Sequence, residues 1–83
     1  MWDEEKRSSN LDKHGVDFDA MEEFDWQAAD IEPSPRGGEI RYRATGYIGP
    51  RLYVTVFTRR GENTRIISLR KADRQEVRDY ERP

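Results

Sequence analysis

The sequence predicts an α+β fold, with two N-terminal helices, a three- to four-stranded antiparallel twisted sheet and a C-terminal helix. Three observations support it. Capping residues bracket residues 4–14, alternating apolar residues and turn formers mark residues 39–71, and a capping box opens a last helix at Asp73. We expect one small domain, residues 1–83, with a thin core, because the chain is 34% hydrophobic and 39% charged.

The first helix is expected over residues 4–14. Asp3 can cap its N-terminus, and Lys13 and His14 lie in its last turn, where a cation interacts favourably with the helix dipole. Gly15 follows at the position where a left-handed residue commonly ends a helix. The local signals at both ends therefore agree on the same helix.

A second, short helix is expected after Asp17, which can cap it. The apolar residues of this segment recur every three positions along one face, and they are Phe18, Met21 and Phe24. Residues 25–32 are ambiguous between a short strand and an irregular connection. Residues 33–38 are expected to form a loop because proline and glycine dominate them.

Three strands are expected next, over residues 39–47, 51–58 and 64–71. Arg41 and Arg43 alternate with apolar residues, so they share one face of the first strand. The second strand is apolar or β-branched on both faces, which favours a central place in the sheet. Arg65 and Arg70 are five positions apart, so a regular third strand directs them to opposite faces. Both could then bind one phosphate only if the strand contained a bulge.

Charge is divided unequally along the chain. Residues 1–35 contain 3 Lys and Arg against 11 Asp and Glu, whereas residues 36–83 contain 12 against 6, and eleven of those twelve cations are arginine. Arginine pairs with phosphate through two N–H groups and stays charged at any working pH. The arginine-rich strands predict a surface for a polyanion, and RNA is the first candidate. The acidic first third is either solvated helix surface or a field that directs RNA to the sheet.

The composition also disfavours several classes of protein. The chain has no cysteine, no carboxylate or histidine cluster with the spacing of metal ligands, and no glycine-rich nucleotide loop. We therefore expect no metal and no cofactor. No apolar run approaches the roughly 20 residues of a membrane span, so we expect a cytoplasmic protein with no membrane association.

Several residue groups occur in the same order as in a known family. They are Trp2-Asp3, Lys6, Asn10, Lys13-His14-Gly15-Val16, Phe18 and Ala20 at the start, Gly38-Glu39-Ile40-Arg41-Tyr42, Gly46 and Arg51 in the middle, and Val54 to Thr58, Arg60-Gly61, Arg65-Ile66-Ile67-Ser68, Arg70, Ala72, Glu76 and Tyr80 at the end. Together they resemble the BrnT-type toxins over nearly the whole chain. Each group is weak by itself, but the ordered set is specific.

This resemblance implies a toxin of a type II toxin–antitoxin system with a RelE-like ribonuclease fold, an endoribonuclease that cleaves RNA and arrests growth. It also implies a cognate antitoxin with a ribbon-helix-helix DNA-binding domain, with operator DNA bound only through that antitoxin. Two departures from the family pattern stand out. Only Met1 precedes Trp2 where the family often has a short strand, and Ser34-Pro35 precede Arg36 where it tends to have an acidic residue.

Metal-independent cleavage of RNA needs a base for the 2′-hydroxyl proton, cations for the phosphorane and an acid for the leaving 5′-oxygen. The catalytic candidates are Arg65, Arg70, His14, Glu39 and Tyr80. Each also has a structural alternative. The two arginines can be solvated or ion-paired, His14 can stabilise a helix end, Glu39 can pair within the sheet, and Tyr80 can pack in the core.

Further cations are candidates for binding RNA, namely Arg41, Arg43, Arg51, Arg60 and Lys71. Two other functions remain open. The same arginine-rich sheet could belong to a non-catalytic RNA- or protein-binding module. Alternatively, the chain could fold usefully only as half of a complex with an oppositely charged partner.

Overall fold

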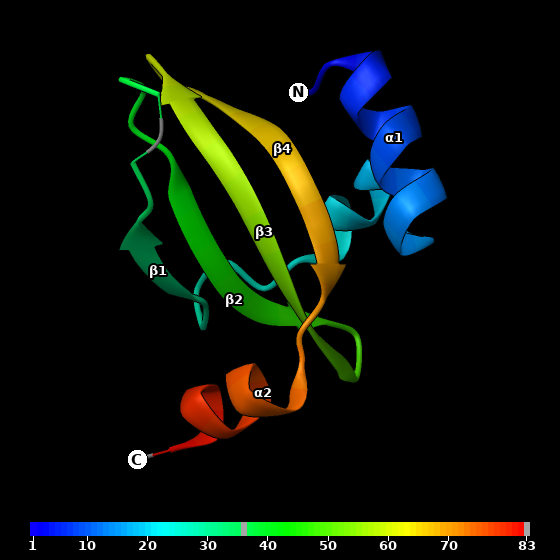
Figure 1. Cartoon of the computed structure of the whole chain (residues 1–83). Coiled ribbons are helices and arrows are strands. Elements are labelled where there is room, and N and C mark those ends of the chain that lie inside the picture. Colours follow the sequence, from blue (N-terminus) through cyan, green and yellow to red (C-terminus); the bar gives the residue numbers. More distant parts are fainter. Residues whose placement is uncertain (36, 83) are drawn as a thin grey trace.

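Four antiparallel strands form the centre of the fold in the computed structural model, which describes residues 1–35 and 37–82 (Figure 1). The strand order β1-β2-β3-β4 is a simple meander. The elements in chain order are α1 (Glu4–His14), the 3₁₀ helix η1 (Phe18–Glu23), β1 (Asp30–Pro33), β2 (Tyr42–Ile48), β3 (Arg51–Arg60), β4 (Asn63–Lys71) and α2 (Arg74–Glu81). The predicted α+β class is confirmed.

Several details differ from the expectation. The second N-terminal helix is a 3₁₀ helix, and the ambiguous segment ends in β1, which pairs with β2. β2 begins only at Tyr42, because Gly37 and Gly38 turn the preceding chain with φ of 58° and 77°. β3 extends to Arg60, where its pairing with Asn63 leaves a two-residue turn.

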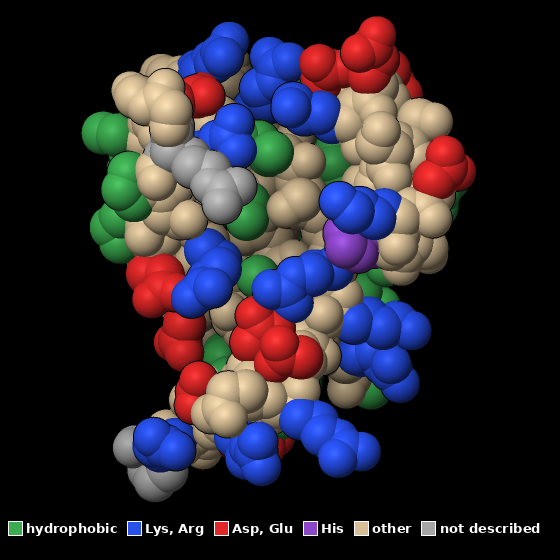
Figure 2. Space-filling view, in the orientation of Figure 1, with side chains coloured by type: hydrophobic (Ala, Val, Ile, Leu, Met, Phe, Trp, Pro, Cys, Tyr) green, Lys and Arg blue, Asp and Glu red, His purple; other side chains and the backbone are tan. Residues whose placement is uncertain are grey.

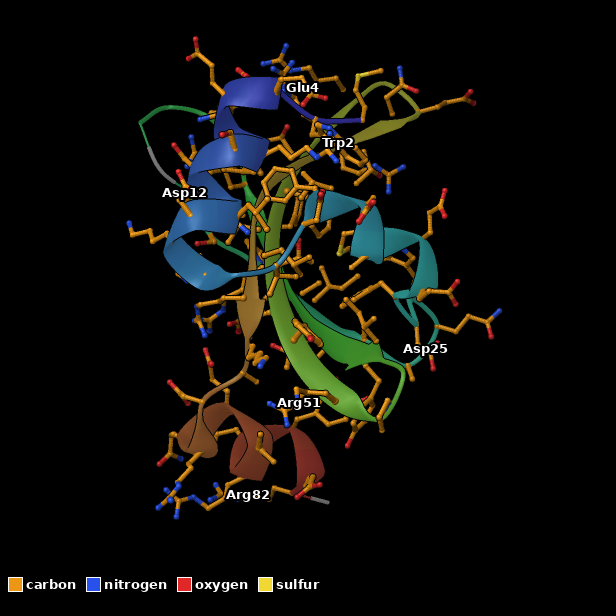
Figure 3. The ribbon with its side chains drawn as sticks, turned by 90° about the vertical axis from the view of Figure 1, so that its right-hand side faces the viewer. Trp2, Glu4, Asp12, Asp25, Arg51 and Arg82 are labelled. Atoms are coloured by element: carbon orange, nitrogen blue, oxygen red, sulfur yellow. The ribbon has the colours of Figure 1, made fainter. Side chains whose placement is uncertain are left out.

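The two faces of the sheet have different surroundings. Figure 3 views the molecule from the β4 side and shows η1 and the segment around Asp25 on one side of the sheet. Figure 1 shows the other face open toward the viewer, with α1 beside β4 and α2 beyond one end of the strands. The core lies under η1 and consists of Val16, Phe18, Met21, Phe24, Ala44, Phe57, Ile66 and Leu69. No helix among the described residues is long and apolar enough to cross a membrane.

Asn10 attaches α1 to the outer edge of β4. Its side-chain amide donates to the carbonyl of Leu69 at 2.7 Å and accepts from the N–H of Leu69 at 3.0 Å. The same amide donates to the carbonyl of Val16 at 3.1 Å, so it also holds the chain that leaves the helix. Asn10 is buried, and it supplies the partners that a neighbouring strand would otherwise supply to this edge.

The N-terminal segment covers the next part of the same edge. The N–H of Ile66 donates to the carbonyl of Met1 at 2.9 Å, and Trp2 forms an isolated parallel bridge with Ile66. Within the described residues, the N-terminal segment meets this edge through a single bridge and not through a strand.

The start and end of α1 follow the predicted capping. Asp3 accepts from the N–H of Glu5, and Gly15 ends the helix with φ of 71°. Arg7 then donates to both carboxylate oxygens of Asp17, at 2.7 and 2.8 Å, and thereby fixes the corner between α1 and η1. These hydrogen bonds from Arg7 hold the pKa of the Asp17 carboxyl below its usual range.

β4 contains a bulge that changes the direction of its arginines. Val56 pairs with Ser68, but the next residue of β3, Phe57, pairs with Ile66, so Ile67 is the extra residue. Arg65 therefore pairs with Thr58 and Arg70 pairs with Val54, two positions of β3 on the same face. The expectation that Arg65 and Arg70 point to opposite faces was wrong, because it assumed a regular strand.

We expect the Asn10→Ala substitution to lower the free energy of unfolding by roughly 2–4 kcal/mol, because both backbone groups of Leu69 would lose buried partners. Urea denaturation followed by circular dichroism measures this change. Ser8→Ala, at an exposed position of the same helix, is the matched control and should change the free energy by less than about 0.5 kcal/mol. A loss no larger than that of the control would contradict the role given to Asn10.

Candidate functional site

The open face of the sheet carries most of the predicted site residues. Strand register and alternation place five arginines and one carboxylate there, and we call this surface the arginine face: Glu39, Arg41, Arg43, Arg60, Arg65 and Arg70. Figure 2 shows Lys and Arg side chains gathered over this face, with hydrophobic side chains visible between them. Leu52, Val54 and Thr58 lie on this face and are nonetheless buried, as expected where long arginine stems cover apolar surface.

At one end of this face, the nearest carboxylates lie too far from the arginines to form hydrogen bonds with them. Glu39 lies 4.0 Å from Arg41 and 3.7 Å from Arg60, and Arg65 lies 3.7 Å from Asp3. These nitrogen–oxygen distances are too long for direct hydrogen bonds. We call Glu39, Arg41, Arg60 and Arg65 the open cluster, because its guanidinium groups keep donors that an anionic ligand could use.

Two buried polar atoms beside the open cluster lack hydrogen-bond partners among the described residues. They are the Nε of Arg41 and the hydroxyl of Thr58, and Thr58 is the strand partner of Arg65. Native proteins rarely leave such atoms unpaired, so each one calls for a local explanation.

The opposite end of the arginine face is neutralised by the protein's own carboxylates. Arg70 donates to both oxygens of Glu76, at 2.7 and 2.8 Å, and Arg43 forms an ion pair with Glu32 of β1. The hydrogen bonds with Arg70 lower the pKa of Glu76, and the same bonds raise the pKa of Arg70. Glu76 also closes the capping box of α2 with Asp73, so this pair ties α2 to β4.

Arg65 and Arg70 share a face but do not converge on one point. Five residues of strand span roughly 15 Å, and Arg70 extends toward α2 while Arg65 approaches Asp3. A single phosphate therefore cannot contact both arginines in this arrangement. An extended polyanion could contact them at successive positions.

The other candidate residues lie outside this cluster. The hydroxyl of Tyr80 donates to the carbonyl of Ala28 at 2.7 Å, its ring packs edge-on against Tyr47, and burial raises its pKa. Tyr80 thus anchors α2 at the far end of β2 from Glu39. His14 lines a groove between α1 and β4, next to the arginine face (Figure 2).

Register assigns two of the predicted RNA-binding residues to the other side of the sheet. Arg51 pairs with Ile48 and Lys71 pairs with Tyr53, positions that alternate with those of the arginine face. Both side chains are exposed, and Figure 3 shows Arg51 at the end of the sheet near α2. Arg36, which the family pattern brought into consideration, lies outside the described residues.

Sequence reasoning missed two residues that shape this site. Glu76 was noted only as part of the capping box and of the family pattern, and its further role as the partner of Arg70 depends on where α2 packs. Thr58 was noted only for its place in a strand and in the family pattern. Among the described residues, no group of three or more His, Cys, Asp or Glu side chains is arranged to hold a metal ion.

The geometry defines a protein with an arginine-rich sheet face that its own carboxylates neutralise at one end. Comparison with known proteins specifies the class: a family model described as the ribonuclease toxin, BrnT, of type II toxin–antitoxin systems matches residues 2–76. A search of curated proteins gave no match. The chain belongs to the BrnT family of ribonuclease toxins, as its sequence resemblance predicted, and membership implies an RNA substrate and a cognate antitoxin.

We expect α2 to detach from the sheet in acid, because Glu76 has a lowered pKa. A carboxyl group whose pKa is lowered by folding stabilises the folded state at any pH above its ordinary pKa, which is about 4.3 for glutamate. This contribution is lost as the pH falls through the lowered pKa of the folded state. NMR amide shifts of residues 77–81 should therefore change as pH falls below the ordinary pKa of a glutamate, while those of β3 stay native. In the Glu76→Gln variant, residues 77–81 should show at pH 7 the amide shifts that the wild-type protein shows only in acid.

Asp79→Asn is the matched control for this experiment. Among the described residues, Asp79 accepts a hydrogen bond from Gln75 of the same helix and forms none with Arg70. This variant should keep the wild-type pH response. Equal behaviour of the two variants would contradict the idea that the pair of Arg70 and Glu76 holds α2.

Proposed function

We propose that this chain is a metal-independent endoribonuclease toxin and that the phosphate of the cleaved bond binds at the open cluster. The observation that carries this proposal is the open cluster itself. Three guanidinium groups and one carboxylate share one end of an open face, with no ion pair among them closer than 3.7 Å. Membership of the BrnT family supplies the substrate class, RNA.

The chemistry follows from the order of the residues along this face. A phosphate that binds Arg41 and Arg60 takes over guanidinium donors now directed at Glu39. The Glu39 carboxylate then accepts the proton of the 2′-hydroxyl as the 2′-oxygen attacks phosphorus. Arg65 and its neighbours stabilise the charge that builds on the phosphorane, and the leaving 5′-oxygen takes its proton from water.

The remaining candidates have different parts in this proposal. Arg70 binds a neighbouring phosphate once RNA competes with Glu76 for its guanidinium group. Tyr80 positions α2 and takes no part in the proton transfers, because its hydroxyl is engaged by Ala28. His14 contacts RNA beside the arginine face rather than at the cleaved bond.

We further propose a RelE-like fold and a cytoplasmic site of action. The four-stranded antiparallel sheet with helices at both ends of the chain supports such a fold. The cognate antitoxin would carry a ribbon-helix-helix domain, and operator DNA would be bound only through that domain. Neutralisation would then follow if the antitoxin covered the arginine face.

A second candidate function is a non-catalytic module that binds RNA on the same face. One observation favours it: Glu39 is the only carboxylate of the open cluster, and no histidine or tyrosine of the described residues belongs to it. A bound strand without a second acid–base group would be held but cleaved slowly. The cleavage experiments below separate the two functions.

We expect the purified protein to cleave single-stranded RNA in EDTA and to leave 2′,3′-cyclic phosphate ends, since the 2′-oxygen is the nucleophile. Electrophoresis of a labelled RNA and mass spectrometry of its fragments measure both properties. Intact RNA at a large excess of folded protein, in EDTA and in Mg²⁺, would favour the binding module instead. Circular dichroism establishes that the protein used is folded.

Substitutions in the open cluster should reduce cleavage without unfolding the protein. We expect Arg65→Ala to lower kcat by about 100- to 1,000-fold, the usual effect of removing one preorganised donor. Glu39→Gln should lower kcat by about 100-fold or more while RNA still binds.

Arg59→Ala is the matched control for the open cluster. Arg59 is exposed on the adjacent position of β3, and its register with Thr64 directs it away from the arginine face. The Arg59→Ala variant removes the same charge as Arg65→Ala. Its kcat should stay within about threefold of the wild-type value, as expected for an exposed side chain without contacts to the site. A comparable loss in this variant would show that overall charge, rather than the open cluster, drives cleavage.

A further inference from the structure

A groove of about 390 Å³ lies between α1 and β4, and of its lining residues only His14 was given an RNA contact above. Residues of α1 form one wall and residues of the bulged part of β4 form the other, including Lys6, Ser9, Lys13, His14, Ile67 and Ser68. Its volume is within the range of small-ligand sites. We call it the α1 groove.

The α1 groove is lined by Lys6 and Lys13, the two cations of residues 1–35 without an ion-pair partner among the described residues. Residues 1–35 contain only three Lys and Arg, and Arg7 is engaged by Asp17. The other two, Lys6 and Lys13, both line the groove because a spacing of seven residues returns to the same side of a helix. Neither forms an ion pair with a described residue, so both ammonium groups are available to an anion.

The groove is continuous with the arginine face. Ser68 lines the groove and pairs with Val56, on the same face as Arg65 and Arg70 and between them along β4. Asp3, which also lines the groove, lies 3.7 Å from Arg65. In Figure 2 the histidine at the groove and neighbouring Lys and Arg side chains lie on the same side of the molecule as the arginine face.

Polar groups in the groove suit a sugar–phosphate chain. The hydroxyls of Ser9 and Ser68 can donate to phosphate or accept from a 2′-hydroxyl, and Lys6 and Lys13 supply charge. Asn10 is already satisfied by Leu69, so it contributes to the position of the wall and not to recognition. Asp3 and Glu5 repel phosphate from the part of the groove near the N-terminus of α1. An RNA strand would therefore bind nearer to Lys13 and His14.

We propose that the α1 groove is a second RNA-binding subsite, which holds nucleotides that flank the cleaved bond as the strand crosses β4. This inference rests on the proposed function, because it takes RNA as the ligand of the arginine face. A short RNA would fill the open cluster alone, whereas a longer strand would also reach Lys6 and Lys13. The groove therefore makes affinity depend on RNA length.

The test uses fluorescence anisotropy with a 12-nucleotide and a 3-nucleotide 2′-O-methyl RNA, neither of which can be cleaved. Lys6→Ala/Lys13→Ala should weaken binding of the 12-nucleotide RNA by about tenfold or more. Loss of two phosphate contacts should reduce the slope of log affinity against log salt by about 1.4, from 0.7 per contact with single strands. Affinity for the 3-nucleotide RNA should stay within about twofold, since it does not reach the groove.

Arg59→Ala/Arg78→Ala is the matched control, because it removes two exposed cations that lie outside both the arginine face and the groove. It should leave the salt slope for the 12-nucleotide RNA unchanged. Equal losses in the two double variants, or equal losses for the two RNA lengths, would overturn the proposal. So would an unchanged salt slope for the lysine variant.

The two proposals fail in different ways. If the wild-type protein shows the expected length dependence but leaves unmodified RNA intact in EDTA, the ribonuclease mechanism fails and the groove stands. If the wild-type protein cleaves RNA and the lysine variant binds the long RNA normally, the groove fails and the mechanism stands. Thermal unfolding of each variant shows whether its fold is intact.

Discussion

The contact of Asn10 with Leu69 decides where the N-terminal third of this small protein lies. β4 is an edge strand, and its outward backbone groups need partners that a sheet neighbour would normally provide. One buried amide satisfies both groups of Leu69, and Met1 satisfies Ile66. With α1 held along this edge, Asp3 comes close to Arg65 and the α1 groove opens beside the bulge.

The arginine face shows how a thin domain holds many like charges together. Five guanidinium groups on one sheet face repel one another, and carboxylates from β1, α2 and the N-terminal segment reduce that repulsion. The compensation is unequal, because Arg70 has a bidentate partner, whereas the arginines of the open cluster have no carboxylate within hydrogen-bond distance among the described residues. The two ends of the face therefore differ in how far their charge is neutralised, although both carry arginines.

Local signals predicted the parts of the fold that depend on neighbours in the chain. Asp3 and Gly15 bracket α1 as expected, Asp73 and Glu76 form the predicted capping box, and Arg41 and Arg43 share a face. The bulge at Ile67 was not predicted, because it becomes visible only in the register between β3 and β4. The grouping of Arg65 with Arg41 and Arg60 was therefore missed, as was the pairing of Arg70 with Glu76.

By itself the sequence determined the order of elements, the separation of charge between the two parts of the chain and membership of a ribonuclease toxin family. These properties are carried by residue type and by spacings of a few positions. Only the tertiary structure decided which arginines lie on the same face and which are neutralised by a carboxylate. The physical reason is that a side chain's face and its charge partner depend on strand register and on the docking of α1 and α2, which bring together residues far apart in the chain.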